Sequence, residues 1–216
     1  MRSYPGFLAP LLLLGCGQAA VAQLYQPYTA DRPVQWFIDT GASITTGHTS
    51  DDFDSGWTIG TGLLMRPDPT QLLALRFDVN YARADATGQF IAANEAATGQ
   101  PIDHGSLQTV TAFIGPQLEA PLSPWIRVYA MGGVGVGYQR VELTQNGFFC
   151  DAFVCGSGFG HYLVNSSDTT HFAWNAGAGM SFALPGGQSW FLEASYQRIQ
   201  TQGPTELVPI RVGFRF

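Results

Sequence analysis

The most regular feature of this chain is an alternation of apolar and polar residues with a period of two, which is typical of β-strands. The alternation is clearest between positions 72 and 82, and no window shows a sustained helical period. On one face lie Leu73, Leu75, Phe77, Val79 and Tyr81, and on the other Ala74, Arg76, Asp78, Asn80 and Ala82. Such an apolar face on a tilted strand covers about 25 Å, which matches the apolar band of a membrane crossed by strands. The pattern therefore predicts a strand with one face toward lipid.

The same alternation recurs along the chain and predicts eight strands in all. They cover residues 34–44, 57–66, 72–82, 107–120, 125–139, 171–184, 190–198 and 208–216. Short proline-containing connections (67–70, 121–124, 185–189) alternate with longer ones (45–56, 83–106, 140–170, 199–206). This asymmetry is typical of transmembrane barrels with short turns on one side. We predict an all-β fold, an eight-stranded antiparallel up-and-down transmembrane β-barrel over residues 34–216.

Two details refine the predicted strands. Pro116 and Pro209 lie inside them and cannot donate to a ladder, so each predicts a bulge or a strand boundary near a rim. Aromatic residues sort to the two predicted rims, where aromatic belts lie in membrane proteins. One rim has Trp36, Trp125, Trp190 and Phe216, and the other Trp57, Tyr81, Tyr138, Phe172 and Tyr196.

The N-terminal residues predict export from the cytoplasm. Arg2, the apolar run 7–14 and the small residues ending at Ala22 form a signal peptide over 1–22, with a short periplasmic segment at 23–33. The stretch 13–16 is an alternative, because it resembles a lipobox and would make Cys16 a lipidated N-terminus. The remaining cysteines, Cys150 and Cys155, are expected to pair in a disulfide, as is usual for close cysteines in exported chains.

Composition narrows the function further. The chain has 16 acidic and 10 basic residues, and the basic residues are all Arg without a clustered patch, so a nucleic-acid partner is not expected. No CxxC or HxxxH spacing occurs, so we expect neither a metal site nor a cofactor.

Together these features make the chain similar to the eight-stranded outer-membrane barrels: the OmpA transmembrane domain, the OmpX type and the opacity-like surface proteins. The resemblance runs from about Val34 to Phe216 and is most specific in the last strand. There the resemblance implies a signal read by the barrel-assembly machinery, formed by Val208, Ile210, Val212, Phe214 and Phe216. It also implies a location in the bacterial outer membrane, among outer-membrane lipid and lipopolysaccharide.

An eight-stranded barrel is narrow enough for side chains to fill it, so charges that point inward must pair. The predicted lumen charges are four acids and four arginines, namely Asp39, Arg76, Asp78, Glu119, Arg127, Glu193, Arg211 and Arg215. A balanced network of ion pairs is the simplest interpretation. An ion or proton path is the alternative.

Two features bear on activity and partners. The sequence has two His-x-Ser runs, 48–50 and 104–106, and lipid A deacylases carry such an element. Both runs fall in predicted loops, away from an acyl chain, so we expect no catalytic residue and no enzymatic activity. The loop 140–170 is rich in aromatics, which either form a binding surface for an extracellular partner or pack together as a cap.

These observations lead us to expect a structural or surface-interaction role, such as envelope integrity or adhesion-like contacts through the extracellular loops. A small-solute or lipid-handling barrel is the alternative, followed by a lipid A-modifying hydrolase.

Overall fold

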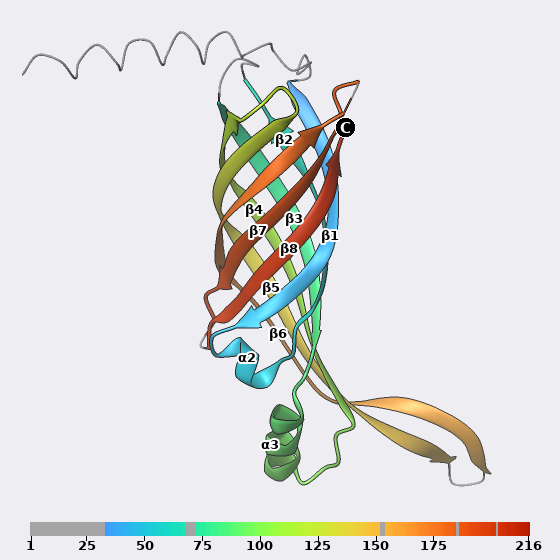
Figure 1. Ribbon diagram of the computed structural model, residues 1–216. Helices are drawn as coiled ribbons and strands as arrows, with labels where there is room; N and C mark the ends of the chain where they lie inside the picture. The colour runs from blue at the N-terminus through green and yellow to red at the C-terminus, as the bar shows by residue number, and fades with distance from the viewer. Residues whose placement is uncertain (1–32, 68–71, 152–153, 185, 202) are drawn as a thin grey trace, which may run out of the picture.

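The computed structural model describes residues 33–67, 72–151, 154–184, 186–201 and 203–216. In these residues each strand pairs antiparallel with the next, and β1 pairs with β8 to close a barrel (Figure 1). The strands are β1 (Val34–Thr46), β2 (Gly56–Met65), β3 (Leu73–Asp85), β4 (His104–Pro121), β5 (Ile126–Asp151), β6 (Val154–Ala183), β7 (Ser189–Ile199) and β8 (Thr205–Arg215). The predicted eight-stranded antiparallel barrel is confirmed.

The two ends of the barrel differ. The C-terminus and the short connections lie at one end, which we call the short-turn end (Figure 1, top). The other end, the long-loop end, carries the helices α2 (Thr49–Asp52) and α3 (Gly88–Thr98) and the far part of the β5–β6 hairpin. Neither described helix is long and apolar enough to cross a membrane.

The alternation in the sequence becomes an inside-out distribution of polarity in the barrel. Ile38 and Val212 on the outer surface are 55% and 47% exposed, whereas Arg211 on the inner surface is fully buried. An apolar outer surface is unfavourable in water, and a charged interior is stable only when its groups are paired. The distribution fits a barrel surrounded by lipid, with a polar lumen.

The β5–β6 hairpin is much longer than the sequence predicts. The segment 140–170, expected to be a loop, continues both strands, and pairing extends to Asp151 and Val154 across two register shifts. The loop assignment is therefore wrong. Apolar and polar residues alternate along a strand where its two faces have different surroundings, here lipid and the lumen. A sheet with water on both faces does not require this alternation, so its sequence does not mark it as a strand.

The connection 83–106, which the sequence predicts only as a long connection without a helical period, contains α3. The hydroxyl of Thr87 accepts a hydrogen bond from the backbone N–H of Phe90 at 3.3 Å, and Gly99 ends the helix in the left-handed region at a φ of 68°. None of its residues is fully buried, so it lacks the apolar stripe by which a helix is found in a sequence.

Neither proline marks a bulge or a boundary. Pro116 pairs with Leu75 of β3, and the register of β4 with β5 is the same before and after it. Pro209 likewise pairs with Ser43 of β1, while pairing between β7 and β8 lapses nearby without a shift. Each proline leaves only a local gap in one ladder, so the expectation of a bulge is wrong.

Candidate functional site

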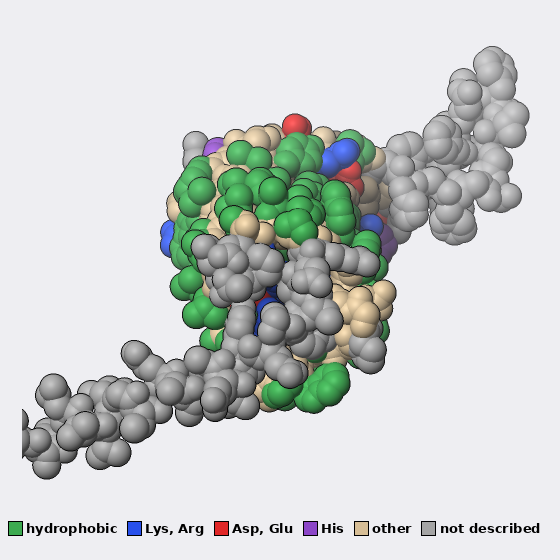
Figure 2. All heavy atoms as spheres, turned by 90° about the horizontal axis from the view of Figure 1, so that it is seen from above, with side chains coloured by type: hydrophobic (Ala, Val, Ile, Leu, Met, Phe, Trp, Pro, Cys, Tyr) green, Lys and Arg blue, Asp and Glu red, His purple; other side chains and the backbone are tan. Residues whose placement is uncertain are grey.

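The charged residues that the sequence assigns to the lumen all point into the barrel. Seven of the eight are buried, and the side chain of Arg127, near the short-turn end, is 18% exposed. Figure 2 looks onto the short-turn end, where blue and red side chains are visible near the centre and hydrophobic side chains cover much of the surrounding described surface. Within the described residues these charges gather in two clusters.

The central cluster is organised around Glu193 of β7. Its carboxylate accepts hydrogen bonds from Arg76 at 2.5 Å, from the hydroxyl of Tyr129 at 3.0 Å, and from Arg211. Arg76 also donates to Asp78 at 2.8 Å, and Arg211 lies 3.6 Å from Asp39. Two guanidinium groups thus share one carboxylate and take a second one each.

The second cluster surrounds Glu119 near the short-turn end. Its carboxylate accepts from Arg66 at 2.8 Å, from Arg215 at 3.1 Å and from Arg127 at 3.4 Å. Sequence reasoning missed Arg66, which is 5% exposed. Continuing the inward alternation of β2 by one step beyond Leu64 finds it.

A layer of aromatic rings lies between the two clusters. Phe37 and Phe191 meet edge to face with centroids 5.8 Å apart, and Tyr129 completes the buried group. The guanidinium of Arg76 lies 4.6 Å from the Phe37 ring on the central side, and that of Arg215 lies 4.8 Å from the Tyr129 ring on the other. Side chains therefore fill the lumen at this level, as expected for so narrow a barrel.

Inward glycines make room for these rings. A Cβ atom on Gly179 would lie 2.5 Å from the Tyr129 ring, and one on Gly213 would overlap the Phe191 ring. Both positions are too close for any side chain, so a larger residue would displace the aromatic layer.

A small apolar cluster closes the long-loop end. Phe53 and Leu107 are buried there, and Phe90 of α3 packs on Phe53 with ring centroids 5.0 Å apart. The hydroxyl of Thr49 in α2 accepts from the backbone N–H of Glu206 at 2.9 Å, which ties α2 to β8. The mouth is thus covered by α2 and α3, whereas the β5–β6 hairpin projects away from it (Figure 1).

The predicted disulfide falls at the tip of that hairpin. Cys150 and Cys155 are direct cross-strand partners in the backbone register. Their side chains, and those of the nearby aromatics, lie outside the described part of the structure, so the disulfide stays a prediction. The signal peptide 1–22, the segment 23–32 and Cys16 also lie outside the described residues.

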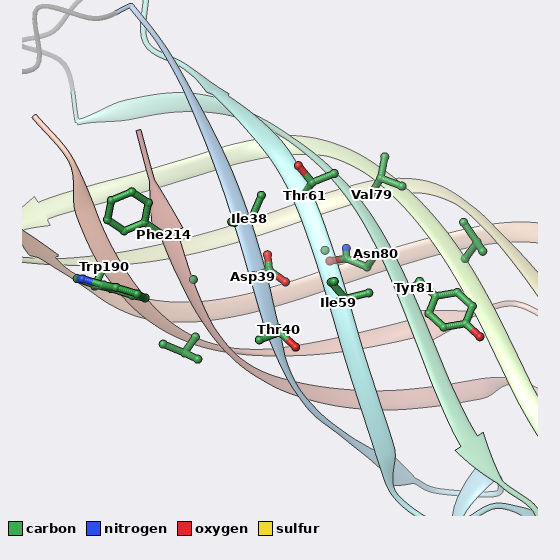
Figure 3. Close-up of a pocket in the computed structure, with 14 residues that line it drawn as sticks. Ile38, Asp39, Thr40, Ile59, Thr61, Val79, Asn80, Tyr81, Trp190 and Phe214 are labelled. Carbon is green, nitrogen blue, oxygen red and sulfur yellow. The ribbon is translucent and has the colours of Figure 1, made fainter.

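The outer surface carries an apolar groove of about 600 Å³ over β1, β2, β3 and β8 (Figure 3). Ile38, Ile59, Val79 and Phe214 contribute to its lining. The hydroxyl of Thr61, also in the lining, donates to the carbonyl of Phe37 at 2.9 Å and so presents no free donor. A surface of this kind suits contact with hydrocarbon chains.

The outward residues of β8 lie on the same lipid-facing surface. Ile210, Val212 and Phe216 are exposed, and Val208 and Phe214 are partly exposed. The backbone of Phe216 exchanges hydrogen bonds of 3.0 and 3.2 Å with Trp36 and extends the closure of the barrel to the last residue.

The two His-x-Ser runs differ in their surroundings. His48 and Ser50 lie at α2, and the hydroxyl of Ser50 donates to the carbonyl of Gly47 at 2.7 Å. His104 and Ser106, by contrast, begin β4, so their assignment to a loop is wrong. His104 and Ser106 line a pocket of about 300 Å³ outside the barrel wall, together with Arg83, Asp85, Ala86, Ile91, Gly105, Glu142 and Thr144.

No group of residues in the described part of the chain is arranged to hold a metal ion.

Comparisons with known proteins agree with this architecture. The family model described as "Outer membrane protein beta-barrel domain" matches residues 8–216. Neisserial surface protein A is 13% identical and has a TM-score of 0.51, over 85% of this chain and 96% of its own. A major outer membrane protein of Thermus thermophilus is 11% identical and has a TM-score of 0.53, over 86% of this chain and 99% of its own. No curated protein sequence matches the chain.

Proposed function

The chain belongs to the outer membrane β-barrel family, and we propose on this basis that it acts as a structural and surface-interaction protein whose β5–β6 hairpin contacts extracellular partners. The family implies the bacterial outer membrane as its location. Short turns are periplasmic in such barrels, so the long-loop end faces the cell exterior. Export by the signal peptide 1–22 is part of the proposal.

The observation that supports this role is the length of the hairpin beyond its neighbours. Pairing of β5 with β4 ends at Thr144, and pairing of β6 with β7 begins at Ala173. Outside these limits the two strands pair with each other alone (Figure 1). Each therefore presents one open edge of backbone N–H and C=O groups, to which another chain can add a strand.

The composition of this edge suits a polar partner. Residues 165–170 of β6 are all exposed and have the sequence Asn-Ser-Ser-Asp-Thr-Thr. They include no lysine or proline, which natural edge strands often use to prevent pairing with other chains. Leu163, 54% exposed, adds an apolar contact next to them.

The lumen argues against the alternative of a small-solute channel. A solute would have to pass the Glu119 cluster, the aromatic layer and the Glu193 cluster in turn. Opening such a path would separate buried ion pairs, at a cost of several kcal/mol.

Trimming the hairpin tests the proposed role. Gln145 and Tyr162 are cross-strand partners, so an Asn-Gly turn can replace residues 146–161 without changing the register below. Cells that display the trimmed barrel should attach to an immobilised extracellular-matrix preparation several-fold less well than cells with the full-length chain, because the trim removes nearly all of the open edge of β5 and the part of the β6 edge before Tyr162. The free energy of unfolding of the purified barrel should change by less than about 1 kcal/mol, because the removed pairs lie outside the barrel wall.

The matched control is a set of cells that display the full-length chain at equal surface abundance. Heat-dependent mobility on a gel checks that both chains are folded. Equal attachment by the full-length and trimmed proteins would contradict the proposed role of the hairpin.

We extend the proposal to the last strand as an assembly signal. Phe216→Ala removes the terminal ring but keeps the backbone bonds to Trp36, so the purified chain should still refold in detergent. The amount inserted in the outer membrane of living cells should fall several-fold, measured by fractionation. Phe182→Ala is the control, since this aromatic is 40% exposed near the same end and Phe216 is 42% exposed. An equal loss for both variants would remove the special role of the terminus.

A further inference from the structure

The charge cluster at the short-turn end of the lumen carries more positive than negative charge. Within the described residues, the cavity beside this cluster is lined by three arginines, Arg66, Arg127 and Arg215, and by one acid, Glu119. All three guanidinium groups share the carboxylate of Glu119. An excess of positive charge inside a barrel is unfavourable unless an anion offsets it.

The central cluster has the opposite balance of charge. There Arg76 and Arg211 have three carboxylates as partners, those of Glu193, Asp78 and Asp39. The aromatic layer separates the two clusters, and no ion pair between described residues crosses it. The positive excess is therefore a property of the short-turn end and not of the lumen as a whole.

Three hydrogen-bond donors of the cavity lining have no protein partner in the described structure. Arg215 is 3% exposed, and its Nε atom forms no hydrogen bond, although its Nη1 atom donates to Glu119 at 3.1 Å. Ser181 and Ser189, which are 5% and 9% exposed, line the same cavity, and neither hydroxyl bonds to a described residue. Buried polar groups normally have a partner. A ligand that accepts hydrogen bonds would supply one for all three.

The strand register brings these donors together. Ser181 of β6 is the direct cross-strand partner of Arg127 in β5, and Ser189 of β7 is the partner of Arg215 in β8. Such partners have Cβ atoms about 5 Å apart. Ser181 pairs with Phe191, two residues along β7 from Ser189, so the two serines are diagonal neighbours. Four adjacent strands thus place two hydroxyl and two guanidinium groups around one position.

The size of the cavity limits what it can hold. Its volume is about 20 Å³, whereas a single water molecule needs about 10–15 Å³. There is room for one ion of nearly atomic size and not for a phosphate or a carboxylate with its substituents. Charged side chains are visible near the centre of the short-turn end in Figure 2, so an ion reaches the cluster from that side.

From these observations we propose that the short-turn end of the lumen binds one small inorganic anion of the size of chloride. The guanidinium groups of Arg127 and Arg215 and the hydroxyls of Ser181 and Ser189 hold the ion. Hydrogen bonds from a charged donor to an anion are about twice as strong as those between neutral groups. The ion offsets part of the positive excess and links β5, β6, β7 and β8 at the end where the chain terminates. It therefore stabilises the closed barrel.

The test compares unfolding of the purified, refolded barrel by urea in sodium chloride and in sodium gluconate at equal ionic strength. Gluconate carries the same charge as chloride but is too large for the cavity. Chloride at about ten times its dissociation constant should lower the unfolding equilibrium constant about tenfold. The effect should follow a binding curve and saturate as chloride replaces gluconate, whereas a general salt effect would not saturate.

Three variants separate the site from the rest of the surface. Arg127→Gln removes one positive charge at a side chain that is 18% exposed, so the barrel should still fold and should lose most of its chloride dependence. Ser181→Ala combined with Ser189→Ala keeps every charge and should raise the chloride concentration of half effect several-fold. Arg140→Gln is the matched control, because this arginine of the same strand is 43% exposed and lies outside the cavity. It should keep the wild-type dependence.

Bromide, which scatters X-rays anomalously, locates the ion in crystals of the refolded barrel. A bromide peak within hydrogen-bond distance of the Arg215 Nε atom and the two serine hydroxyls is the expected result. Equal unfolding in chloride and gluconate would overturn the proposal, and so would an unchanged chloride dependence in Arg127→Gln. Bromide found only at exposed arginines would be an adventitious ion only and would overturn it as well. The hairpin-trimmed chain keeps the cavity and should keep the dependence, so the result is independent of the proposed surface interaction.

Discussion

Replacing Glu193 with Gln should destabilise the barrel by about 3–5 kcal/mol, the cost typical of removing one partner from a buried ion pair. Glu193 is 1% exposed and is shared by Arg76 and Arg211, both of which are also buried. After the substitution, two guanidinium groups retain only Asp78 and Asp39 as carboxylate partners. The free energy of unfolding in urea, measured in lipid vesicles, gives the effect directly.

Glu206→Gln is the matched control for this experiment. Glu206 pairs with Arg198 at 3.5 Å, but the side chain of Arg198 is 36% exposed, so the loss should be below about 1 kcal/mol. The double variant Glu193→Gln with Arg211→Gln should cost less than the sum of the single substitutions, because it removes both members of a pair. If Glu193→Gln cost no more than Glu206→Gln, the lumen network would not be a source of stability.

The sequence was most informative where lipid surrounds the chain. In β3 every second residue faces hydrocarbon, so Leu73, Leu75, Phe77 and Val79 are apolar. The alternation therefore identified both the strand and its lipid-facing side. Beyond the membrane this requirement ends. The outer parts of β5 and β6 are held by backbone pairing, and α3 by its caps and Phe90, none of which leaves a periodic pattern.

The same limit explains what could be predicted about the candidate sites. The period of two gives each strand an apolar face toward lipid and a polar face toward the lumen. Charged residues inside the strands were therefore assigned to the lumen. Arg66 ends the predicted strand 57–66 at an inward position of the alternation, but it was not counted among the lumen charges. The His104–Ser106 pair was placed in a loop because β4 begins beyond Tyr81 and Tyr138 of the outer aromatic rim, where polar residues replace the outer apolar face. Its approach to Glu142 depends on cross-strand register, which no local pattern specifies.

The depth of the barrel in the membrane is tested by a matched pair of substitutions in one strand. Ile114 and Leu118 both point outward from β4, with exposed fractions of 42% and 58%. Ile114 pairs with Phe77 and Val134 in the middle of the lipid-facing band, whereas Leu118 pairs with Leu73 at its short-turn edge. Arginine at mid-membrane in an outer-membrane barrel costs about 2–4 kcal/mol, and near the interface about 1 kcal/mol or less.

Ile114→Arg should therefore destabilise the refolded barrel by about 2–4 kcal/mol and Leu118→Arg by about 1 kcal/mol or less, measured by unfolding in lipid vesicles. The two changes introduce the same charge on the same face of one strand, so their difference isolates depth. In detergent micelles, where depth is poorly defined, the difference should shrink. Equal costs in vesicles would mean that Ile114 does not lie near the membrane centre, and the placement of the lipid-facing band along β4 would then be wrong.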